Sequence, residues 1–122
     1  MLTIKLYKQT ARYKYLINKV AAQRLVFDRL TYFNNFYNFK YSRVSIKNQA
    51  TRWGSCSRQG NLNFNYKIVL LPPDLADYII VHELCHLGQL NHGPKFWQLV
   101  NLTVPDYKLR RHRLRAITLH LT

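Results

Sequence analysis

Acidic residues are scarce in this sequence. Among 122 residues there are 19 lysines and arginines but only 5 aspartates and glutamates, so the formal net charge is +14 at pH 7. A chain with that charge repels itself unless counterions or an anionic partner screen it. Nucleic acid is the first candidate partner, because aromatic residues for base stacking make up 14% of the chain. A basic surface that serves only solubility is the alternative.

Long apolar runs and a set of cysteines are also missing. No run of eighteen or more apolar residues occurs, and the first residues lack the apolar core of a signal peptide, so a membrane span and secretion are disfavoured. Cys56 lies in a Gly-Ser-rich stretch and Cys85 lies in a helical pattern, so the two thiols make no disulfide framework. We expect one cytoplasmic domain over residues 1–122, because this length suits one core rather than two.

The order of apolar and polar residues predicts an α+β fold. Between Tyr13 and Leu30, apolar residues recur at helical spacing with lysines and arginines among them, which predicts an amphipathic N-terminal helix ending near Asn34-Asn35. Short strands are predicted at 44–47, 51–56 and 61–70. In the last, apolar residues alternate with Asn61, Asn63, Asn65 and Lys67, which are expected on the face that contacts water. The turn residues at 58–61 indicate an antiparallel hairpin.

Three further helices are predicted after the strands. Pro72-Pro73 ends the sheet, and Asp74 is a good N-cap for a helix from Leu75 to Leu87 that is apolar nearly all round and therefore buried. Residues 95–102 form a short helical candidate. Beyond Pro105, a tail that mixes arginines with leucine and isoleucine fits an amphipathic C-terminal helix.

The buried helix carries the motif His82-Glu83-Leu84-Cys85-His86. Residues four apart on a helix lie about 40° apart around the axis and about 6 Å along it, so His82 and His86 can share one metal ion. Glu83 lies about 100° round from His82, where its carboxylate can act as a general base without being a ligand. Cys85 is turned away from the two histidines and is predicted to be a packed core thiol.

A hydrolytic zinc site takes three protein ligands and leaves one position open, so a third donor is needed. His92 is the candidate. On a continuous helix it would lie about 9 Å beyond His86 and about 120° round from it, so the helix is predicted to end between them. Gly88 and Asn91 are residue types that permit a left-handed turn there.

Other motifs accompany the histidines, namely RWGSC at 52–56, GNLN at 60–63, NH at 91–92, FW at 96–97 and PDY at 105–107. With them the chain resembles the YgjP-like metallopeptidase-domain family of zincins, from about Val44 to about Arg111. The resemblance implies that His82, His86 and His92 bind one zinc ion and that Glu83 is the catalytic base. It also implies a zincin-like fold, in which a small antiparallel sheet packs against the buried helix.

The resemblance implies a zinc-dependent hydrolase, with a metallopeptidase acting on polypeptide as the first interpretation. A nucleotide pyrophosphatase acting on UTP-type substrates is the alternative, because at least one relative is described in that way. SprT-like and WLM-type zincins are similar around the motif and act on DNA-bound proteins, so a nucleic-acid-associated protein substrate would account for both the charge and the metal site. A basic nucleic-acid-binding module with a structural zinc is a third hypothesis, although the local sequence shows no fourth ligand.

Arg52, Trp53 and Gly54 are the candidate substrate-binding residues. Gly54 permits close approach of an extended peptide, and Arg52 can bind a carboxylate or a phosphate bidentately. Trp53 can stack on a base or line a pocket, and a plug between sheet and helix is an equal alternative for it. Phe96 and Trp97 are predicted to pack in the core. Three tyrosines are candidate transition-state donors that the sequence does not rank: Tyr66, Tyr78 and Tyr107.

Overall fold

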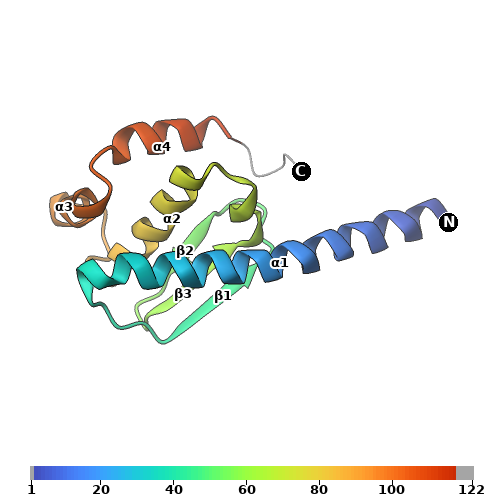
Figure 1. Cartoon of the computed structure of the whole chain (residues 1–122), viewed down its shortest axis with the longest axis horizontal. Coiled ribbons are helices and arrows are strands. Elements are labelled where there is room, and N and C mark those ends of the chain that lie inside the picture. Colours follow the sequence, from blue (N-terminus) through green and yellow to red (C-terminus); the bar gives the residue numbers. More distant parts are fainter. Residues whose placement is uncertain (1, 118–122) are drawn as a thin grey trace.

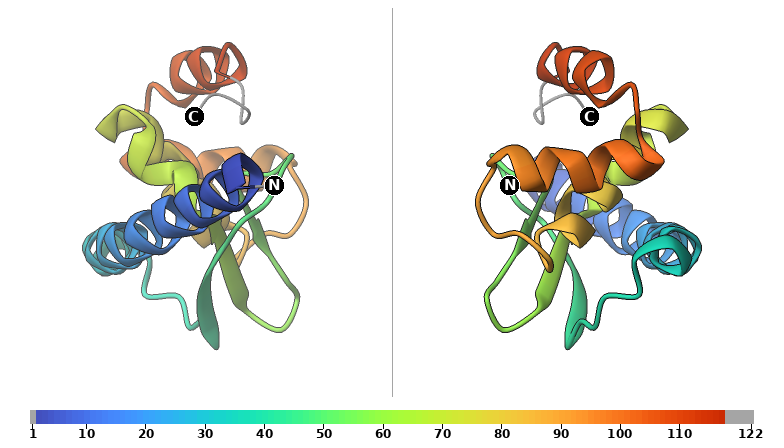
Figure 2. Two further views of the ribbon diagram at one scale, coloured as in Figure 1. Left: turned by 90° about the vertical axis from the view of Figure 1, so that its right-hand side faces the viewer. Right: turned by 90° about the vertical axis from the view of Figure 1, so that its left-hand side faces the viewer.

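The computed structural model describes residues 2–117, with side chains from residue 9 onward. The elements in chain order are α1 (Leu2–Tyr37), β1 (Arg43–Lys47), β2 (Gly54–Cys56), β3 (Asn61–Asn65), the 3-10 helix η1 (Tyr66–Leu70), α2 (Pro73–Cys85), α3 (Pro94–Thr103) and α4 (Tyr107–Arg115). The predicted α+β class is confirmed. Figures 1 and 2 show α4 and the sheet at opposite ends of the molecule with α2 between them.

The three strands form one mixed sheet in the order β1-β3-β2. The predicted hairpin is confirmed, because β2 and β3 pair antiparallel and Gly60 in their connection has φ 82°. The expectation of a wholly antiparallel sheet is wrong, because β1 pairs parallel to β3. β3 inserts between β1 and β2, which run in opposite directions, so it must be parallel to one of them. Alternation of residue types indicates which face of a strand is buried, and it carries no information on pairing partners.

The strand predicted for 61–70 ends at Asn65, where η1 begins. Asn65 was expected on the wet face but is fully buried. Its Nδ2 donates to the carbonyl oxygens of Gln49 (2.7 Å) and Arg52 (2.9 Å), and its Oδ1 accepts from the Lys67 N–H (3.0 Å). These bonds give the backbone an alternative to the sheet ladder, and they fasten the loop that precedes β2.

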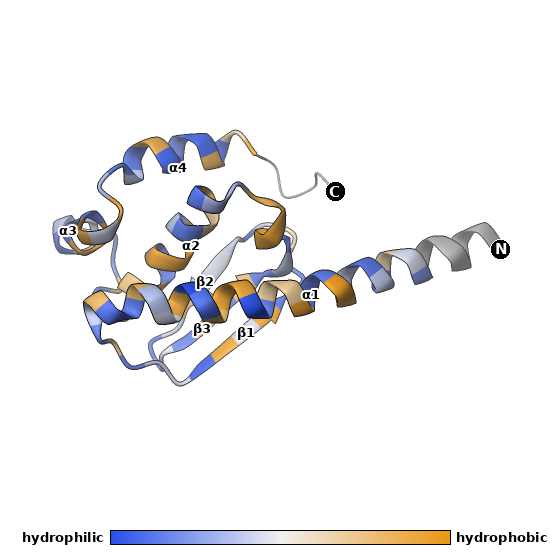
Figure 3. Ribbon diagram, viewed as in Figure 1, coloured by the Kyte–Doolittle hydropathy of each residue, from blue (hydrophilic) through white to orange (hydrophobic). Residues whose placement is uncertain are grey.

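Helix α1 lies across the sheet (Figure 1). It buries one stripe of its surface. The buried residues follow the i, i+4, i+8, i+11 spacing of a single helical face: Ala22, Val26, Leu30 and Phe33. Most of the apolar residues that predict this helix lie outside that stripe and are exposed, and Figure 3 shows apolar residues on more than one side of α1. A bidentate pair between Arg29 and Asp77 joins α1 to α2, with Nε to Oδ1 at 2.8 Å. α1 ends at Tyr37, and Asn38 follows with φ 57°.

Helix α2 is the central buried element, as predicted from its apolar sequence. It begins at Pro73 rather than Leu75, because a proline in the first turn needs no N–H partner. Asp74 is therefore not the N-cap; its carboxylate instead binds Arg113 of α4. Helices α3 and α4 lie close to the predicted positions. In the described part of the chain, no helix is both long and apolar enough to cross a membrane.

Candidate metal centre

Three histidines converge at the C-terminal end of α2. His82 and His86 stand one turn apart on the helix, and His92 comes from the loop before α3. Their Nε2 atoms are 3.2 Å apart for His82 and His86, 3.0 Å for His86 and His92, and 3.2 Å for His82 and His92. Among the described residues, these three form a group of side chains that could hold one metal ion.

The geometry of this group fits zinc. Zinc binds histidine nitrogen at about 2.0–2.1 Å, so two nitrogen ligands of a tetrahedral ion lie about 3.3 Å apart. The observed separations of 3.0–3.2 Å are close to that value. The Nδ1–H of His86 donates to the Gln89 carbonyl oxygen at 3.0 Å, which leaves the Nε2 lone pair facing the other two rings. In this tautomer the neutral imidazole has an unprotonated Nε2, which is the form that can bind a metal ion.

Burial keeps the histidines of α2 neutral. Desolvation, followed by the neighbouring His86, His92 and Arg111, lowers the pKa of His82 to about 3. Desolvation also lowers the pKa of His86, although its bond to the Gln89 carbonyl opposes the shift. Neutral imidazoles are what metal binding requires.

The break between the second and third histidines occurs where the spacing predicts it. α2 ends at Cys85, and the next residues close tight turns in which the N–H groups of Gly88 and Gln89 both donate to the Cys85 carbonyl. Gly88 does not supply a left-handed conformation, because Asn38 and Gly60 are the positive-φ positions in the described chain. It supplies space instead, since a Cβ on Gly88 would lie 2.7 Å from Cζ of Phe39.

Aromatic side chains hold the three rings in place. Phe96 is fully buried, as predicted, and stacks on His86 with ring centroids 4.4 Å apart. Its edge contacts reach His82 at 5.0 Å and His92 at 5.1 Å. Trp97 lies 6.0 Å from His92 in a stacked arrangement and stacks on Tyr107 at 4.9 Å. Both residues of the FW motif are therefore packed, and both also contact the rings of the three converging histidines.

Glu83 faces the sheet. Its side chain is 7% exposed and packs against Gly54, where a Cβ would lie 2.9 Å from Cγ of Glu83. Burial raises the pKa of Glu83 to about 8, and the positive charge of Arg52 opposes the shift. The carboxyl group can therefore exchange a proton near neutral pH, as a general base must.

A cavity of about 210 Å³ opens beside Glu83 and His82. The three residues predicted to bind substrate, Arg52, Trp53 and Gly54, line this cavity. Five further residues line it: Tyr78, which the sequence offered only as an unranked candidate, and Ile79, Arg111, Leu114 and Arg115, which no sequence pattern linked to the site. The α4 residues lie at least 25 positions beyond the motif along the chain, so no local spacing connects them to it.

Tyr78 is the tyrosine that the structure places at the site. Its hydroxyl lies 3.4 Å from Nδ1 of His82, one helical turn away, and this i, i+4 spacing is a signal that sequence reasoning could have used. Burial raises the pKa of Tyr78 to about 12, so the hydroxyl stays protonated. Tyr66 packs instead against Tyr15 at 5.1 Å, and Tyr107 stacks on Trp97.

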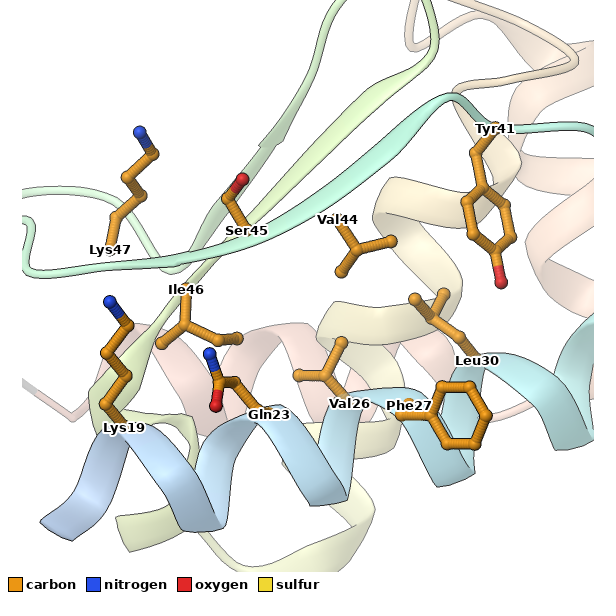
Figure 4. A pocket seen from close by; sticks show the side chains of 10 residues that line it. All are labelled: Lys19, Gln23, Val26, Phe27, Leu30, Tyr41, Val44, Ser45, Ile46 and Lys47. Carbon is orange, nitrogen blue, oxygen red and sulfur yellow. The ribbon is translucent and has the colours of Figure 1, made fainter. Parts of the chain in front are cut away.

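A larger groove of about 640 Å³ lies elsewhere, between α1 and β1 (Figure 4). Val26 and Leu30 of α1 and Ile46 of β1 form its apolar part, and the amino groups of Lys19 and Lys47 lie at one end. None of the three converging histidines lines it. The candidate metal centre therefore uses the smaller cavity next to α2.

Comparisons with known proteins show the fold and the family of this chain. The fold is similar to that of the metallopeptidase zymogen abylysin of Pyrococcus abyssi, with TM-score 0.68 and 23% identity over 75% of this chain and 92% of that one. It is also similar to the zymogen jannalysin of Methanocaldococcus jannaschii, with TM-score 0.61 and 24% identity over 75% of this chain and 97% of that one. No curated protein sequence matches the chain. The model of the YgjP-like metallopeptidase domain matches residues 5–117, and the chain therefore belongs to the YgjP-like metallopeptidase-domain family.

Proposed function

We propose that this protein is a zinc-dependent metallopeptidase with one zinc ion per chain, bound by His82, His86 and His92, and with Glu83 as the general base. The observation that carries the proposal is the convergence of three Nε2 atoms to 3.0–3.2 Å beside a buried carboxyl group. Membership of a metallopeptidase family supports the same activity. The group of three ligands, with no fourth among the described residues, favours a catalytic over a structural zinc.

Each residue of the site has a separate role in the proposed reaction. Zinc bound to three histidines supplies Lewis-acid chemistry, polarising a carbonyl and acidifying a water molecule. Glu83 takes a proton from the attacking water and delivers it to the leaving nitrogen. Gly54 leaves room for that carboxyl group, and Tyr78 accepts the Nδ1–H of His82, which keeps the Nε2 of this ring free to bind metal.

Zinc analysis and peptide hydrolysis test this assignment together. We expect Glu83→Gln to retain zinc and to lose hydrolysis by about 10²- to 10⁴-fold, because a general base is removed without loss of a ligand. His92→Ala should lose zinc, whereas the matched variant of the exposed His112, His112→Ala, should keep both zinc and activity. Unchanged zinc content in His92→Ala, or full activity in Glu83→Gln, would contradict the proposal.

A metal-dependent nucleotide pyrophosphatase is the second candidate function. The observation that favours it is the set of arginines around the cavity, because guanidinium groups bind phosphate as well as carboxylate. Release of pyrophosphate from UTP by the zinc-loaded protein, lost in Glu83→Gln, would establish this activity.

A nucleic-acid-associated protein substrate is a proposal that rests on the charge of +14. It predicts that DNA binding weakens steeply as salt is raised and that peptide cleavage accelerates when the substrate protein is bound to DNA. The cytoplasm is the proposed compartment, since two free thiols suit a reducing environment.

A further inference from the structure

The cavity beside Glu83 is lined by three arginines from two distant segments. Arg52 precedes β2, whereas Arg111 and Arg115 stand one turn apart on α4. Glu83 is the one acidic residue among the lining side chains. A cavity with this lining attracts an anionic group.

The four arginines of α4 fall into two pairs that differ in their contacts. Arg110 donates to the Asp74 carbonyl at 3.1 Å and pairs with Asp106 at 2.9 Å, and Arg113 binds the Asp74 carboxylate. The two contacts with Asp74 hold α4 against the start of α2, and the pair with Asp106 lies at the start of α4 itself. Arg111 and Arg115 take no part in them, and in the described part of the chain neither has a carboxylate within ion-pair distance.

Arg111 is held in place by aromatic contacts rather than by an acid. Its guanidinium lies 5.2 Å from the centre of the Trp97 ring, which in turn stacks on Tyr107. Arg111 and Arg115 line the cavity together with Tyr78 of α2. Two guanidinium groups therefore line the cavity without a carboxylate within ion-pair distance among the described residues, and Arg111 is further held against Trp97.

We infer that Arg111 and Arg115 form a subsite for the carboxylate side chain of a peptide substrate, so that the enzyme selects aspartate or glutamate next to the scissile bond. This inference rests on the proposed peptidase activity. A guanidinium group can bind a carboxylate through two parallel hydrogen bonds, which gives both strength and orientation. A volume of about 210 Å³ suits one side chain better than a whole nucleoside triphosphate, and the sequence has no glycine-rich phosphate loop.

Binding to a hydrolytically inactive protein tests the subsite directly. Zinc-loaded Glu83→Gln protein is titrated with fluorescent peptides in which one glutamate is moved along an otherwise glutamine-containing sequence. We expect roughly tenfold tighter binding than the all-glutamine peptide at one position of the glutamate. When Arg111→Gln and Arg115→Gln are introduced together into the Glu83→Gln protein, the preference for glutamate should disappear. The matched control adds Arg24→Gln and Arg58→Gln, which remove the same charge at exposed positions outside the cavity and should leave the preference intact.

The outcomes separate the subsite from the peptidase activity. Equal binding of all peptides, or an equal loss of preference in both double variants, would overturn the inference. Displacement by UTP with no glutamate preference would also overturn it, in favour of the nucleotide. If the wild-type protein cleaves peptides with no preference for glutamate, the peptidase stands and the subsite fails. If the preference is present but no peptide is cleaved, the carboxylate subsite stands and the peptidase fails.

Discussion

The Glu83 side chain occupies the space that a side chain at position 54 would need. A methyl group on Gly54 would lie 2.9 Å from Cγ and 3.1 Å from Oε2 of Glu83, and 3.0 Å from the Asn63 carbonyl oxygen. Because the backbone of β3 cannot yield easily, the Glu83 side chain must move. We expect Gly54→Ala to keep zinc but to lower kcat/KM for peptide by at least about tenfold, because a displaced general base loses its geometry.

Gly93→Ala is the matched control for this substitution. Gly93 precedes α3 with φ −84°, and a Cβ there would meet nothing within 4 Å. Its activity should therefore stay close to that of the wild type. Equal kcat/KM values for the two alanine variants would show that contact with Gly54 does not position Glu83.

Asn65 is the buried polar residue on which the loop before β2 depends. Its amide makes three hydrogen bonds to backbone groups of the loop and of η1, and it has no exposed surface. Asn65→Ala leaves those groups without partners, so we expect the free energy of unfolding in urea to fall by about 2–4 kcal/mol. Asn63→Ala removes a single side-chain bond to Ser55 at 3.2 Å and should cost less than about 1 kcal/mol. Similar losses in both variants would count against this role.

At the scale of elements, the docking of α4 depends on its contacts with Asp74 at the start of α2. Asp74→Asn removes the charge that binds Arg113 and leaves the carbonyl contact with Arg110 in place. We expect α4 to open more often, so that trypsin cleaves within 107–115 roughly two- to fivefold faster while zinc content is unchanged. Asp28→Asn, on the exposed side of α1, is the control and should show the wild-type rate. Unaltered cleavage in Asp74→Asn would mean that other contacts hold α4.

Patterns within one element predicted the fold best. Periodicity and turn residues indicated the helices and the β2–β3 hairpin, and the spacing of His82, His86 and His92 required a break that the structure contains. These patterns did not predict which strands pair with each other or in which direction. The parallel pairing of β1 with β3 depends on how the chain crosses between strands, which no residue pattern in 48–53 records.

The same limit applies to the candidate site. Residues within the motif were predicted because a helix fixes their relative positions. Arg111 and Arg115 reach the site through the docking of α4, so only long-range contacts reveal them. Asn65 was misassigned because alternation treats an asparagine as a surface residue, whereas here it replaces the hydrogen bonds of a strand.

At the scale of the whole molecule, two buried groups of the site couple protonation to folding in opposite directions. In the metal-free protein His82 has a pKa of about 3, against 6.5 for an unperturbed histidine, so between these values the unfolded chain binds a proton that the folded chain does not. Stability is then lost as the pH falls below 6.5. Glu83 has a pKa of about 8, against 4.5, so the folded chain binds the extra proton and stability is gained as the pH falls through this range.

The contributions of His82 and Glu83 to the free energy of unfolding oppose each other between pH 6.5 and 4.5. Substitution of one residue should therefore leave the pH dependence of the other visible. We expect metal-free Glu83→Gln to lose stability on acidification over this window more steeply than the wild type, by up to about 1.4 kcal/mol per pH unit. His82→Gln should show the reverse change. Urea unfolding at pH 6.5, 5.5 and 4.5 after treatment with a chelator measures all three proteins. His112→Gln, on the exposed side of α4, should follow the wild type. Parallel pH curves for the wild type and Glu83→Gln would mean that burial does not hold the Glu83 proton, and the carboxyl group would then be ionised in the folded protein even without the metal.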